Sequence, residues 1–473
     1  MHLIEQTRTQ TRVQEPTDTD TYRLAVFNRA GTAVLLESQD SGRTLPCVRI
    51  SKFTRPAQEI TALLRRRWQI PSILLFSGSL EETQESAFFA ALESQTQAAL
   101  PPAGLDWFPV HYAISHLLSK QEGRILESTH SRAAKSTMGT DPEPFSRLGW
   151  LGNLEAWIGT VIRPLDAMRL RGFEQLNGCE TFSLIRFETT HRPLWFKAVG
   201  EPNLHEFPIT MALARLFPAF VPSVLASQPE VHGWLMTDSA GATLNEMADP
   251  SAWHKAVEAL AGIQIASTNR LNELLEAGCP DLRITTLLEL LDPFLEVMAD
   301  LMKQQTKVPP VILSERDFSE LSVMIKDALQ CLDTLEIPPT LGHSDFNPAN
   351  IIVGRERCTF LDWAEAHVSH PFLTFEFLLA HLRKDFQQLA SVEKDLRATY
   401  SGAWSAVASP GQIAEAYLFS PLVAVYAYAV SAQIWRNPER LKIPGFPGYL
   451  RCLTRRMKQE ADSLLRRRFE CLN

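Results

Sequence analysis

Two carboxylates and one amide lie close together along a single short segment of the chain. Asp345 precedes Asn350 by five residues, and Asp362 follows after two short β-like runs, Ile351–Val353 and Thr359–Leu361. A tight loop would direct Asp345 and Asn350 into the same cleft, and the hairpin formed by the two runs would return Asp362 to it. Phosphoryl transfer from a nucleotide needs a carboxylate that orients or deprotonates the acceptor, and oxygen ligands that hold Mg²⁺ on the phosphates. The spacing therefore indicates a phosphoryl-transfer site.

This segment resembles the catalytic loop of the aminoglycoside phosphotransferase and choline kinase group, a branch of the protein-kinase-like fold. Members carry the pattern H-x-D-x-x-x-x-N, followed by an apolar pair, an Asp and an aromatic residue, and the residues that fill it here are His343, Asp345, Asn350, Asp362 and Trp363. The resemblance implies that Asp345 is the catalytic base and that His343 shapes the loop by hydrogen bonding. It also implies that Asn350 and Asp362 hold Mg²⁺, that ATP is the phosphate donor, and that the acceptor is a small molecule.

An ATP-binding lobe must precede such a loop, and the run Leu194–Val199 has the features of a strand in that lobe. Lys197 lies within this apolar run, where a charge is costly unless it meets an anion. The resemblance implies that Lys197 binds the phosphates and that the next helix supplies a glutamate partner. Glu206 opens a helix-like segment nine residues after the lysine and is the expected partner, whereas Glu201 is the alternative.

The segment from Gly233 to Leu244 resembles the hinge of the same family. By this resemblance Met236 backs the adenine, and the backbone of Thr237 and Asp238 binds the adenine edge. Upstream, residues 176–183 occupy the place of a phosphate-covering turn, but they hold one glycine rather than a G-x-G-x-x-G pattern. This turn is therefore a weak signal when taken alone.

The residues after Asp362 depart from the family pattern. Relatives tend to have a Pro followed by a further Asp, and here Pro371 is present while Thr374 occupies the Asp position. The nearby side chains that could face an acceptor are those of His367, His370, Glu365 and Glu376. A structural role is the favoured interpretation for the two histidines. The two glutamates could meet a cationic substrate or could be ordinary surface residues.

Patterning along the chain predicts an α+β protein with a two-lobed, protein-kinase-like fold preceded by a separate α/β N-terminal domain. The expected parts are a disordered tail (residues 1–21), the N-terminal α/β domain (22–119), a polar linker (120–144), a small β-rich lobe (145–240) and a large helical lobe (241–473).

The N-terminal domain faintly resembles a Nudix hydrolase, in which a helix carries metal-binding glutamates. Here Arg66 and Arg67 fall where those glutamates would be needed. Because cations cannot hold Mg²⁺, we expect a binding or assembly module without metal chemistry.

Composition argues against several other classes of function. The formal charge of −8 over 473 residues gives no electrostatic footprint for nucleic acid. The seven cysteines have neither zinc-site nor CxxC spacing, which favours reduced thiols in a cytoplasmic protein. The apolar stretch Leu418–Ile434 is marginal in length for a membrane span and contains Pro421, so a buried helix is expected instead. The oligomeric state and the identity of the acceptor are left open.

These observations predict an ATP- and Mg²⁺-dependent phosphotransferase that transfers the γ-phosphate to a hydroxyl or amine of a small molecule. The alternative is a catalytically silent kinase-like module that binds nucleotide or protein. Retention of the whole set Lys197, Asp345, Asn350 and Asp362 favours activity. A protein kinase is disfavoured, because the D-F-G and A-P-E motifs are absent from the sequence.

Overall fold

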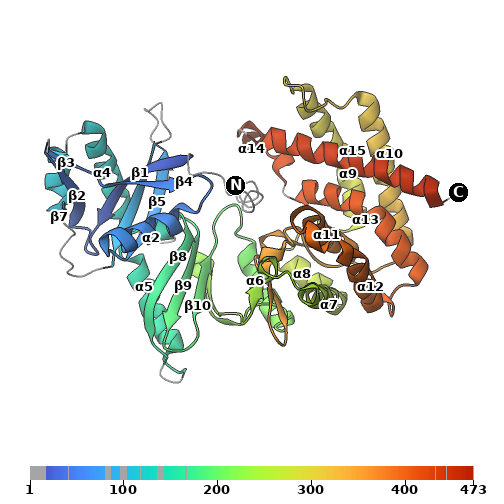
Figure 1. Ribbon diagram of the computed structural model, residues 1–473, viewed down its shortest axis with the longest axis horizontal. Helices are drawn as coiled ribbons and strands as arrows, with labels where there is room; N and C mark the ends of the chain where they lie inside the picture. The colour runs from blue at the N-terminus through green and yellow to red at the C-terminus, as the bar shows by residue number, and fades with distance from the viewer. Residues whose placement is uncertain are drawn as a thin grey trace. The chain divides into compact units, whose positions relative to one another are not determined.

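The computed structural model describes residues 18–40, 42–79, 87–95, 104–117, 119–135, 143–165, 168–431, 433–443 and 445–471. The chain forms two compact units, each with its own hydrophobic core (Figure 1). Unit 1 comprises residues up to 207 together with 224–238, and unit 2 comprises 208–223 together with 239–473. The predicted α+β class is confirmed, since unit 1 is built on two sheets and unit 2 mainly on helices. Residues 1–17 of the predicted tail lie outside the described residues, and the first strand already begins at Thr19.

The first sheet of unit 1 has seven strands in the order β3-β2-β1-β6-β5, with β4 paired to β1 and β7 paired to β2. The β1–β6 pair is parallel, and the other pairs are antiparallel. Its elements are β1 (Thr19–Phe27), β2 (Ala33–Gln39), β3 (Gly42–Thr44), β4 (Cys47–Ser51), α2 (Pro56–Trp68), β5 (Ser72–Ser79), β6 (Ala87–Ser94), β7 (Leu105–Pro109), α3 (Val110–His116) and α4 (Lys120–Ala133).

The second sheet of unit 1 is antiparallel, in the order β11-β12-β10-β9-β8. Its elements are η1 (Pro144–Ser146), α5 (Trp150–Ile162), β8 (Leu170–Gly178), β9 (Ser183–Thr189), β10 (Leu194–Ala198), β11 (Val224–Gln228), η2 (Pro229–Val231) and β12 (Gly233–Thr237). Helix α6 (Glu206–Leu216) begins in unit 1 and continues into unit 2.

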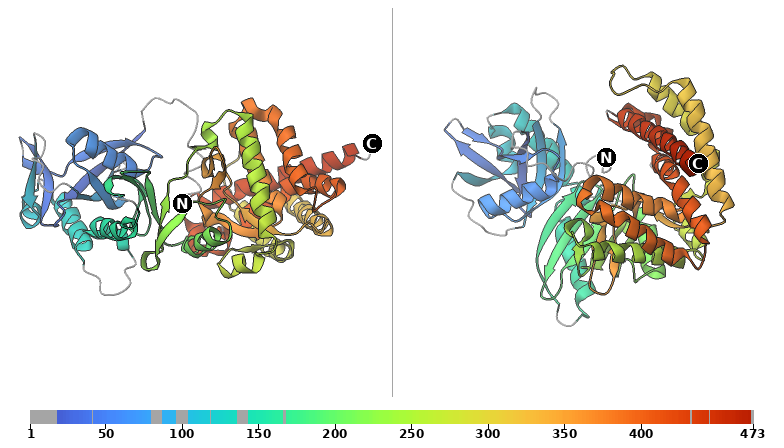
Figure 2. Two further views of the ribbon diagram at one scale, coloured as in Figure 1. Left: turned by 90° about the horizontal axis from the view of Figure 1, so that it is seen from below. Right: turned by 45° about the vertical axis from the view of Figure 1, so that its right-hand side comes forward.

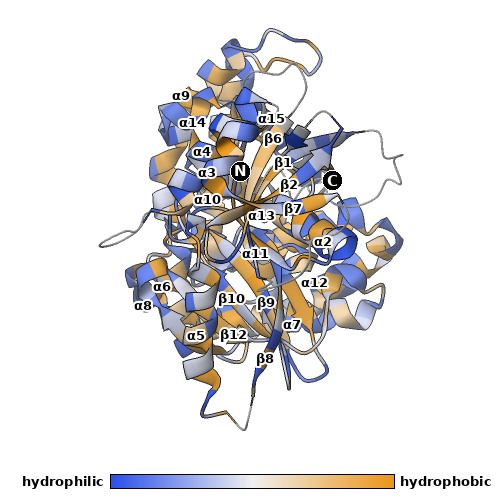
Figure 3. Ribbon diagram, turned by 90° about the vertical axis from the view of Figure 1, so that its left-hand side faces the viewer, coloured by the Kyte–Doolittle hydropathy of each residue, from blue (hydrophilic) through white to orange (hydrophobic). Residues whose placement is uncertain are grey.

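One hydrophobic core joins the two sheets of unit 1. Phe76 of β5 belongs to the same buried cluster as Phe187 of β9, Phe196 of β10 and Ile158 of α5. The exposed side of α2, which carries Arg65 to Arg67, is hydrophilic (blue in Figure 3). The N-terminal sheet and the β-rich lobe are therefore one compact unit, because each buries apolar surface against the other.

Helix α4 occupies most of the segment that the sequence predicts to be a linker. Ser119 caps it by accepting a hydrogen bond from the N–H of Glu122. The carboxylate of Glu122 is buried, accepts the N–H of Leu45 at 3.1 Å and lies 3.4 Å from Arg23. Leu126 is fully buried on the same helix. The linker interpretation of residues 120–133 is thus wrong: the segment is polar, but tertiary contacts far along the chain stabilise it as a helix.

Unit 2 is mainly helical and carries two small three-stranded sheets, ordered β13-β16-β17 and β14-β18-β15. Its helices are α7 (Pro250–Ser267), α8 (Leu271–Glu276), α9 (Ile284–Lys303), α10 (Glu315–Thr334), α11 (Pro371–Asp385), α12 (Glu393–Trp404), α13 (Pro410–Ser431), α14 (Pro438–Lys442) and α15 (Phe446–Cys471). Its strands and 3₁₀ turns are β13 (Ala242–Thr243), η3 (Leu244–Glu246), β14 (Asp281–Leu282), β15 (Thr340–His343), η4 (Pro348–Asn350), β16 (Ile351–Val353), β17 (Cys358–Phe360), η5 (Trp363–Glu365), β18 (Ala366–Ser369), η6 (Gln387–Val392) and η7 (Ile434–Arg436). Figure 2 shows α9 and α10 side by side.

Helix α13 is the apolar segment that raised the question of a membrane span. Within the described residues it is the one helix long and apolar enough to cross a bilayer, and 72% of its most apolar window is buried inside the protein. Its buried residues include Leu422, Val423 and Tyr426, which belong to the core of unit 2. The prediction of a buried core helix is confirmed.

Candidate active site

The ion pair of the β-rich lobe joins the strand β10 to the start of α6. The ammonium of Lys197 lies 2.5 Å from Oε1 of Glu206, and both side chains are buried. A buried ammonium and a buried carboxylate each offset the desolvation cost of the other. The predicted pairing of Lys197 with Glu206, rather than with Glu201, is confirmed.

The hinge strand β12 lies between β10 and β11. The backbone N–H of Asp238 donates to the carbonyl of Pro193 at 3.2 Å, and its carboxylate accepts the indole N–H of Trp195 at 2.6 Å. Hydrogen-bonded and non-bonded residue pairs alternate along an antiparallel ladder. Because Asp238 is hydrogen-bonded to Pro193, directly before β10, its neighbour Thr237 forms a non-bonded pair with Leu194, and the N–H and C=O of Thr237 point away from β10. On that side the pairing with β11 ends at Met236. The N–H of Asp238 is already bonded to Pro193. Of the two residues predicted to bind the adenine edge through their backbone, Thr237 is therefore the one whose N–H points away from β10.

In unit 2 the carboxylate of Asp345 is held by two side-chain amides. Nδ2 of Asn347 donates to Oδ1 at 2.9 Å, and Nδ2 of Asn350 donates to Oδ2 at 3.1 Å. Asn350 also donates to the backbone carbonyl of Asp345 at 3.0 Å. Burial raises the pKa of Asp345, with a further rise from Asp362, against opposing effects of His343 and Asn347. The charge of Asp362 therefore acts on the carboxylate of Asp345, and the sharing of one cleft by the two stays a prediction.

His343 is buried directly before this loop and connects it to its surroundings. Its Nε2 lies 3.0 Å from the carbonyl of Leu361, and its backbone N–H donates to Oγ1 of Thr374 at 3.0 Å. Its ring packs against Trp363, with ring centroids 4.9 Å apart. Thr374, which occupies the position where the family pattern would place an Asp, therefore anchors the strand that leads to Asp345. The structure also adds Asn347, which the sequence motif leaves variable and which holds the carboxylate of Asp345.

Asp362 has a left-handed backbone conformation, with φ 62° and ψ 63°, at the start of η5. Aspartate tolerates this conformation better than most residues, yet it is uncommon outside glycine. Such conformations concentrate at functional sites, where the surrounding structure maintains them. The carbonyl of Asn350 accepts the N–H of Leu361 at 2.9 Å, which connects the catalytic loop to the residue before Asp362.

The side chains in this loop fit a divalent cation bound together with phosphates. The Nδ2 of Asn350 is engaged by Asp345, so its amide oxygen is the atom able to ligate a metal. Burial, followed by the negative charges of Asp345 and Asp362, raises the pKa of the nearby Glu365 to about 8. Among the described residues no group of three or more His, Cys, Asp or Glu has metal-binding geometry. Mg²⁺ does not need one, because phosphate oxygens and water complete its coordination.

The other candidate acceptor residues are internal. His367 and His370 are buried, and burial lowers their pKa values to about 4 and about 3, so both are neutral at pH 7. The carboxylate of Glu376 is buried and lies 2.9 Å from Arg397 and 3.4 Å from Arg383. The surface position considered for Glu376 is therefore wrong, since this carboxylate is enclosed by an ion-pair network within the helices.

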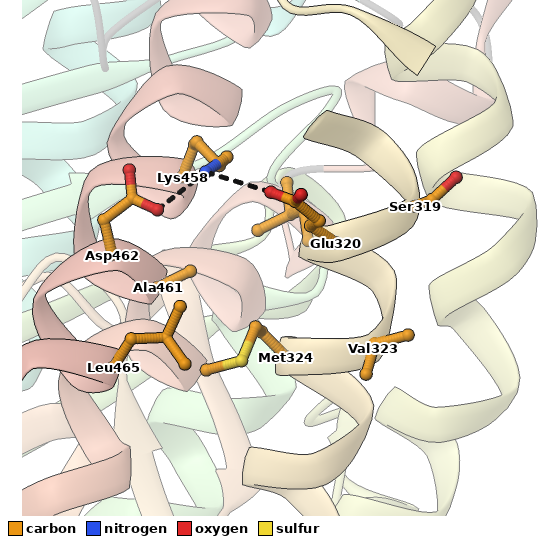
Figure 4. A pocket seen from close by; sticks show the side chains of 9 residues that line it. Ser319, Glu320, Val323, Met324, Lys458, Ala461, Asp462 and Leu465 are labelled. Atoms are coloured by element: carbon orange, nitrogen blue, oxygen red, sulfur yellow. Dashed lines mark hydrogen bonds and ion pairs between the residues drawn. The ribbon is translucent and has the colours of Figure 1, made fainter. Parts of the chain in front are cut away.

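A separate hollow lies between α10 and α15 (Figure 4). Its walls include the apolar side chains of Val323, Met324 and Leu465. At its rim Lys458 lies 2.6 Å from Asp462 and 3.7 Å from Glu320. None of the predicted site residues lines this hollow, so it is distinct from the loop around Asp345.

Comparison with known proteins gives a family for part of the chain. Residues 200–409 match the model of the family described as "Phosphotransferase enzyme family". No curated protein matches the chain. Similar solved structures include a choline/ethanolamine kinase family protein from Mesorhizobium loti, with 14% identity, TM-score 0.42 and coverage of 66% of this chain and 98% of that chain. An ethanolamine kinase from Plasmodium vivax has 13% identity, TM-score 0.45 and coverage of 72% and 93%. A macrolide 2'-phosphotransferase from Brachybacterium faecium has 14% identity, TM-score 0.39 and coverage of 62% and 99%.

The matched segment leaves the N-terminal sheet outside, so the resemblance of that region to Nudix hydrolases stays a prediction. It also begins three residues after Lys197. The segment does include Glu206, Asp345, Asn350 and Asp362. Residues 200–409 of this chain are therefore similar to the phosphotransferase enzyme family.

Proposed function

We propose that the chain transfers the γ-phosphate of ATP, with Mg²⁺, to a hydroxyl or amine of a small molecule. The observation that carries this proposal is the environment of Asp345. Two amide donors fix its carboxylate at 2.9 and 3.1 Å, and burial raises its pKa. A fixed carboxylate of raised basicity is what a general base requires.

The roles of the chain's own residues follow from their chemistry. A carboxylate oxygen of Asp345 accepts the proton of the acceptor group, whose oxygen or nitrogen then bonds to the γ-phosphorus as ADP leaves. Lys197, oriented by Glu206, neutralises charge on the phosphates. The amide oxygen of Asn350 and the carboxylate of Asp362 would hold Mg²⁺, which supplies positive charge to the phosphate oxygens. Thr237 offers its backbone to the adenine.

A panel of candidate acceptor molecules would identify the chemical class of the substrate. Purified protein with Mg·ATP would be incubated with amino alcohols, amino sugars, macrolides and simple sugars, while ADP release is followed by a coupled assay and products by mass spectrometry. We expect ADP release to rise with at least one class and the phosphorylated acceptor to appear. The control is Asp345→Asn, which keeps the size of the side chain and removes its basicity.

The competing hypothesis is a silent module that binds nucleotide without using it. Such a protein would bind Mg·ATP, yet it would release ADP no faster than Asp345→Asn with every acceptor and with water alone. That result would contradict the proposed phosphoryl transfer and support the hypothesis of a module that only binds nucleotide.

A further inference from the structure

The N-terminal part of unit 1 contacts the turn that joins β8 to β9. This turn comprises residues 179–182, and we call it the β8–β9 turn. Arg132, near the end of α4, places Nη2 3.1 Å from Oε1 of Glu180 in this turn. The same guanidinium donates to both carboxylate oxygens of Glu143, at 2.8 and 3.0 Å. An arginine with two donors on one carboxylate is fixed in orientation, so its remaining contact with Glu180 has a defined geometry.

Further contacts hold Arg132 from other directions. Its guanidinium lies over the ring of Phe76 on β5, with its central carbon 4.2 Å from the ring centroid, which is within cation–π range. Its backbone carbonyl accepts a hydrogen bond from Arg147 at 2.9 Å. The guanidinium of Arg132 is therefore held in one orientation by its contacts with Glu143 and Phe76.

Glu180 is held through its backbone as well as through its side chain. Its carbonyl accepts the N–H of Phe145 at 3.1 Å. Within the turn, the N–H of Cys179 donates to the carbonyl of Phe182 at 2.9 Å. Both the carboxylate and the carbonyl of Glu180 are thus tied to residues that precede the sheet of the β-rich lobe.

The β8–β9 turn lies against the strand that carries Lys197. Ser183, directly after the turn, pairs with Ala198 of β10. A Cβ atom placed on Gly200 would lie 2.3 Å from the Cβ of Thr181, so only glycine lets the turn approach this closely. The turn is therefore packed close to the end of β10, within three residues of Lys197.

We propose that Arg132 is a positioning residue for the nucleotide: it fixes the β8–β9 turn through Glu180 and thereby strengthens nucleotide binding. This inference rests on the proposed function, because it assigns to the turn a place over the phosphates. It gives the N-terminal region a role in the kinase reaction that needs no catalysis of its own. Residues 1–199 lie outside the matched family segment, so Arg132 is a feature that the family match does not supply.

The test measures the affinity for a non-hydrolysable ATP analogue with Mg²⁺ by calorimetry. We expect Arg132→Gln and Glu180→Gln each to raise Kd about three- to fivefold, the size expected for a partly exposed ion pair. Because both variants remove the same contact, the double variant should be no weaker than the poorer single variant. Arg132→Lys should restore part of the affinity. In turnover, the KM for ATP should rise while the KM for the acceptor stays constant.

The matched control is Arg65→Gln. Arg65 also connects the N-terminal sheet to the β-rich lobe, since it donates to the carbonyl of Phe173 on β8 at 2.7 Å, but it makes this contact away from the β8–β9 turn. We expect Arg65→Gln to leave Kd unchanged. Glu180→Gln keeps the test valid even if Arg132→Gln fails to fold, because it removes the charge of a side chain in a turn and leaves the backbone bond from Phe145 in place.

Three outcomes would overturn the inference. An unchanged Kd for the ATP analogue in both single variants would show that the Arg132–Glu180 contact has no role in nucleotide binding. An equal loss in Arg65→Gln would assign the effect to docking of the whole N-terminal sheet. A wild-type protein that binds no nucleotide would contradict the proposed function, and the positioning role with it.

Discussion

Asp345 combines a fixed orientation of its carboxylate with a raised pKa. Its carboxylate is held by Asn347 and Asn350, and burial raises its pKa. The amides restrict its orientation, whereas burial and the negative charge of Asp362 make it a stronger base. A base of this kind is already held in orientation before the acceptor binds.

Asp345→Asn should lower kcat by about 10²–10⁴-fold, since that is the usual contribution of a general base. Affinity for Mg·ATP should change little, because the proposed role of Asp345 is toward the acceptor. Steady-state kinetics and calorimetry on the same preparation separate the two effects. The exposed Asp395→Asn, on α12, is the matched control and should behave like wild type. A turnover equal to wild type in Asp345→Asn would exclude it as the base.

Asp362→Asn should abolish the Mg²⁺-dependent part of ATP affinity, and Asn350→Ala should weaken it less. A carboxylate supplies a full charge to the cation, whereas an amide oxygen supplies a dipole. Asparagine is the suitable replacement at 362 because it tolerates the positive φ of 62°, so the backbone is retained. Titrations with and without Mg²⁺ give the difference directly. An Asp362→Asn protein that still binds Mg·ATP more tightly than free ATP would refute this assignment.

His370 should make the protein less stable in acid. Its folded pKa, about 3, lies below its ordinary value of 6.5, so the unfolded chain binds more protons between these pH values. Stability is therefore lost as pH falls from 6.5 towards 3, by at most about 1.4 kcal/mol per pH unit from this residue. His370→Phe should flatten that loss, measured by urea midpoints at pH 7 and pH 4.5. The exposed His191→Phe is the control, and identical acid slopes in wild type and His370→Phe would contradict the account.

At the scale of elements, β8 is the strand that fastens the β-rich lobe to the N-terminal sheet. Gln175 is 2% exposed, and its side-chain amide bonds both backbone groups of Leu74 on β5. It accepts the N–H of Leu74 at 2.7 Å and donates to the carbonyl at 3.1 Å. These bonds satisfy the backbone polar groups of Leu74, which lies next to a shift in the register between β5 and β6, between Leu74 and Phe76. One side chain of β8 in the second sheet thus bonds both backbone groups of a residue of β5 in the first sheet.

Gln175→Ala should lower the free energy of unfolding by about 2 kcal/mol or more, because it leaves two buried backbone groups without partners. The comparison is Gln58→Ala, whose amide reaches Glu174 at 3.3 Å in a part-buried contact and should cost less than about 1 kcal/mol. Urea denaturation at neutral pH measures both. Equal costs in the two variants would show that the buried bonds to Leu74 do not fasten the sheets.

Elements with a strong local pattern could be predicted from the sequence, and those that depend on distant contacts could not. The hairpin after Asn350 forms at Ile351–Val353 and Cys358–Phe360, within one residue of expectation. Helix α9 spans Ile284–Lys303, within the part of the chain that is predicted to be helical. The polar sequence of α4 predicts a linker, and the partners that stabilise it as a helix, Leu45 and Arg23, lie about eighty to one hundred residues away along the chain. The motif likewise indicated Asp345 and Asn350, but not the support from Asn347 and Thr374.

At the scale of the whole molecule, the boundary inferred from composition and the boundary formed by packing differ. Polarity placed a division at residues 120–144, whereas packing joins residues up to 207 with 224–238 in one compact unit. The shared core explains this, because Phe76 and Ile73 of β5 are buried with residues of the second sheet. We infer that the N-terminal region works as part of the nucleotide-binding lobe, a role that matches the contact between Arg132 and Glu180.

The most direct test of the proposed phosphotransferase site is a crystal structure of the full chain with Mg²⁺ and a non-hydrolysable ATP analogue. We expect phosphate oxygens in contact with the ammonium of Lys197 and a cation ligated by Asn350 and Asp362. The adenine edge should bond the backbone of Thr237. Nucleotide bound elsewhere on the chain, with Lys197 and Asp362 making no contact with it, would contradict the account.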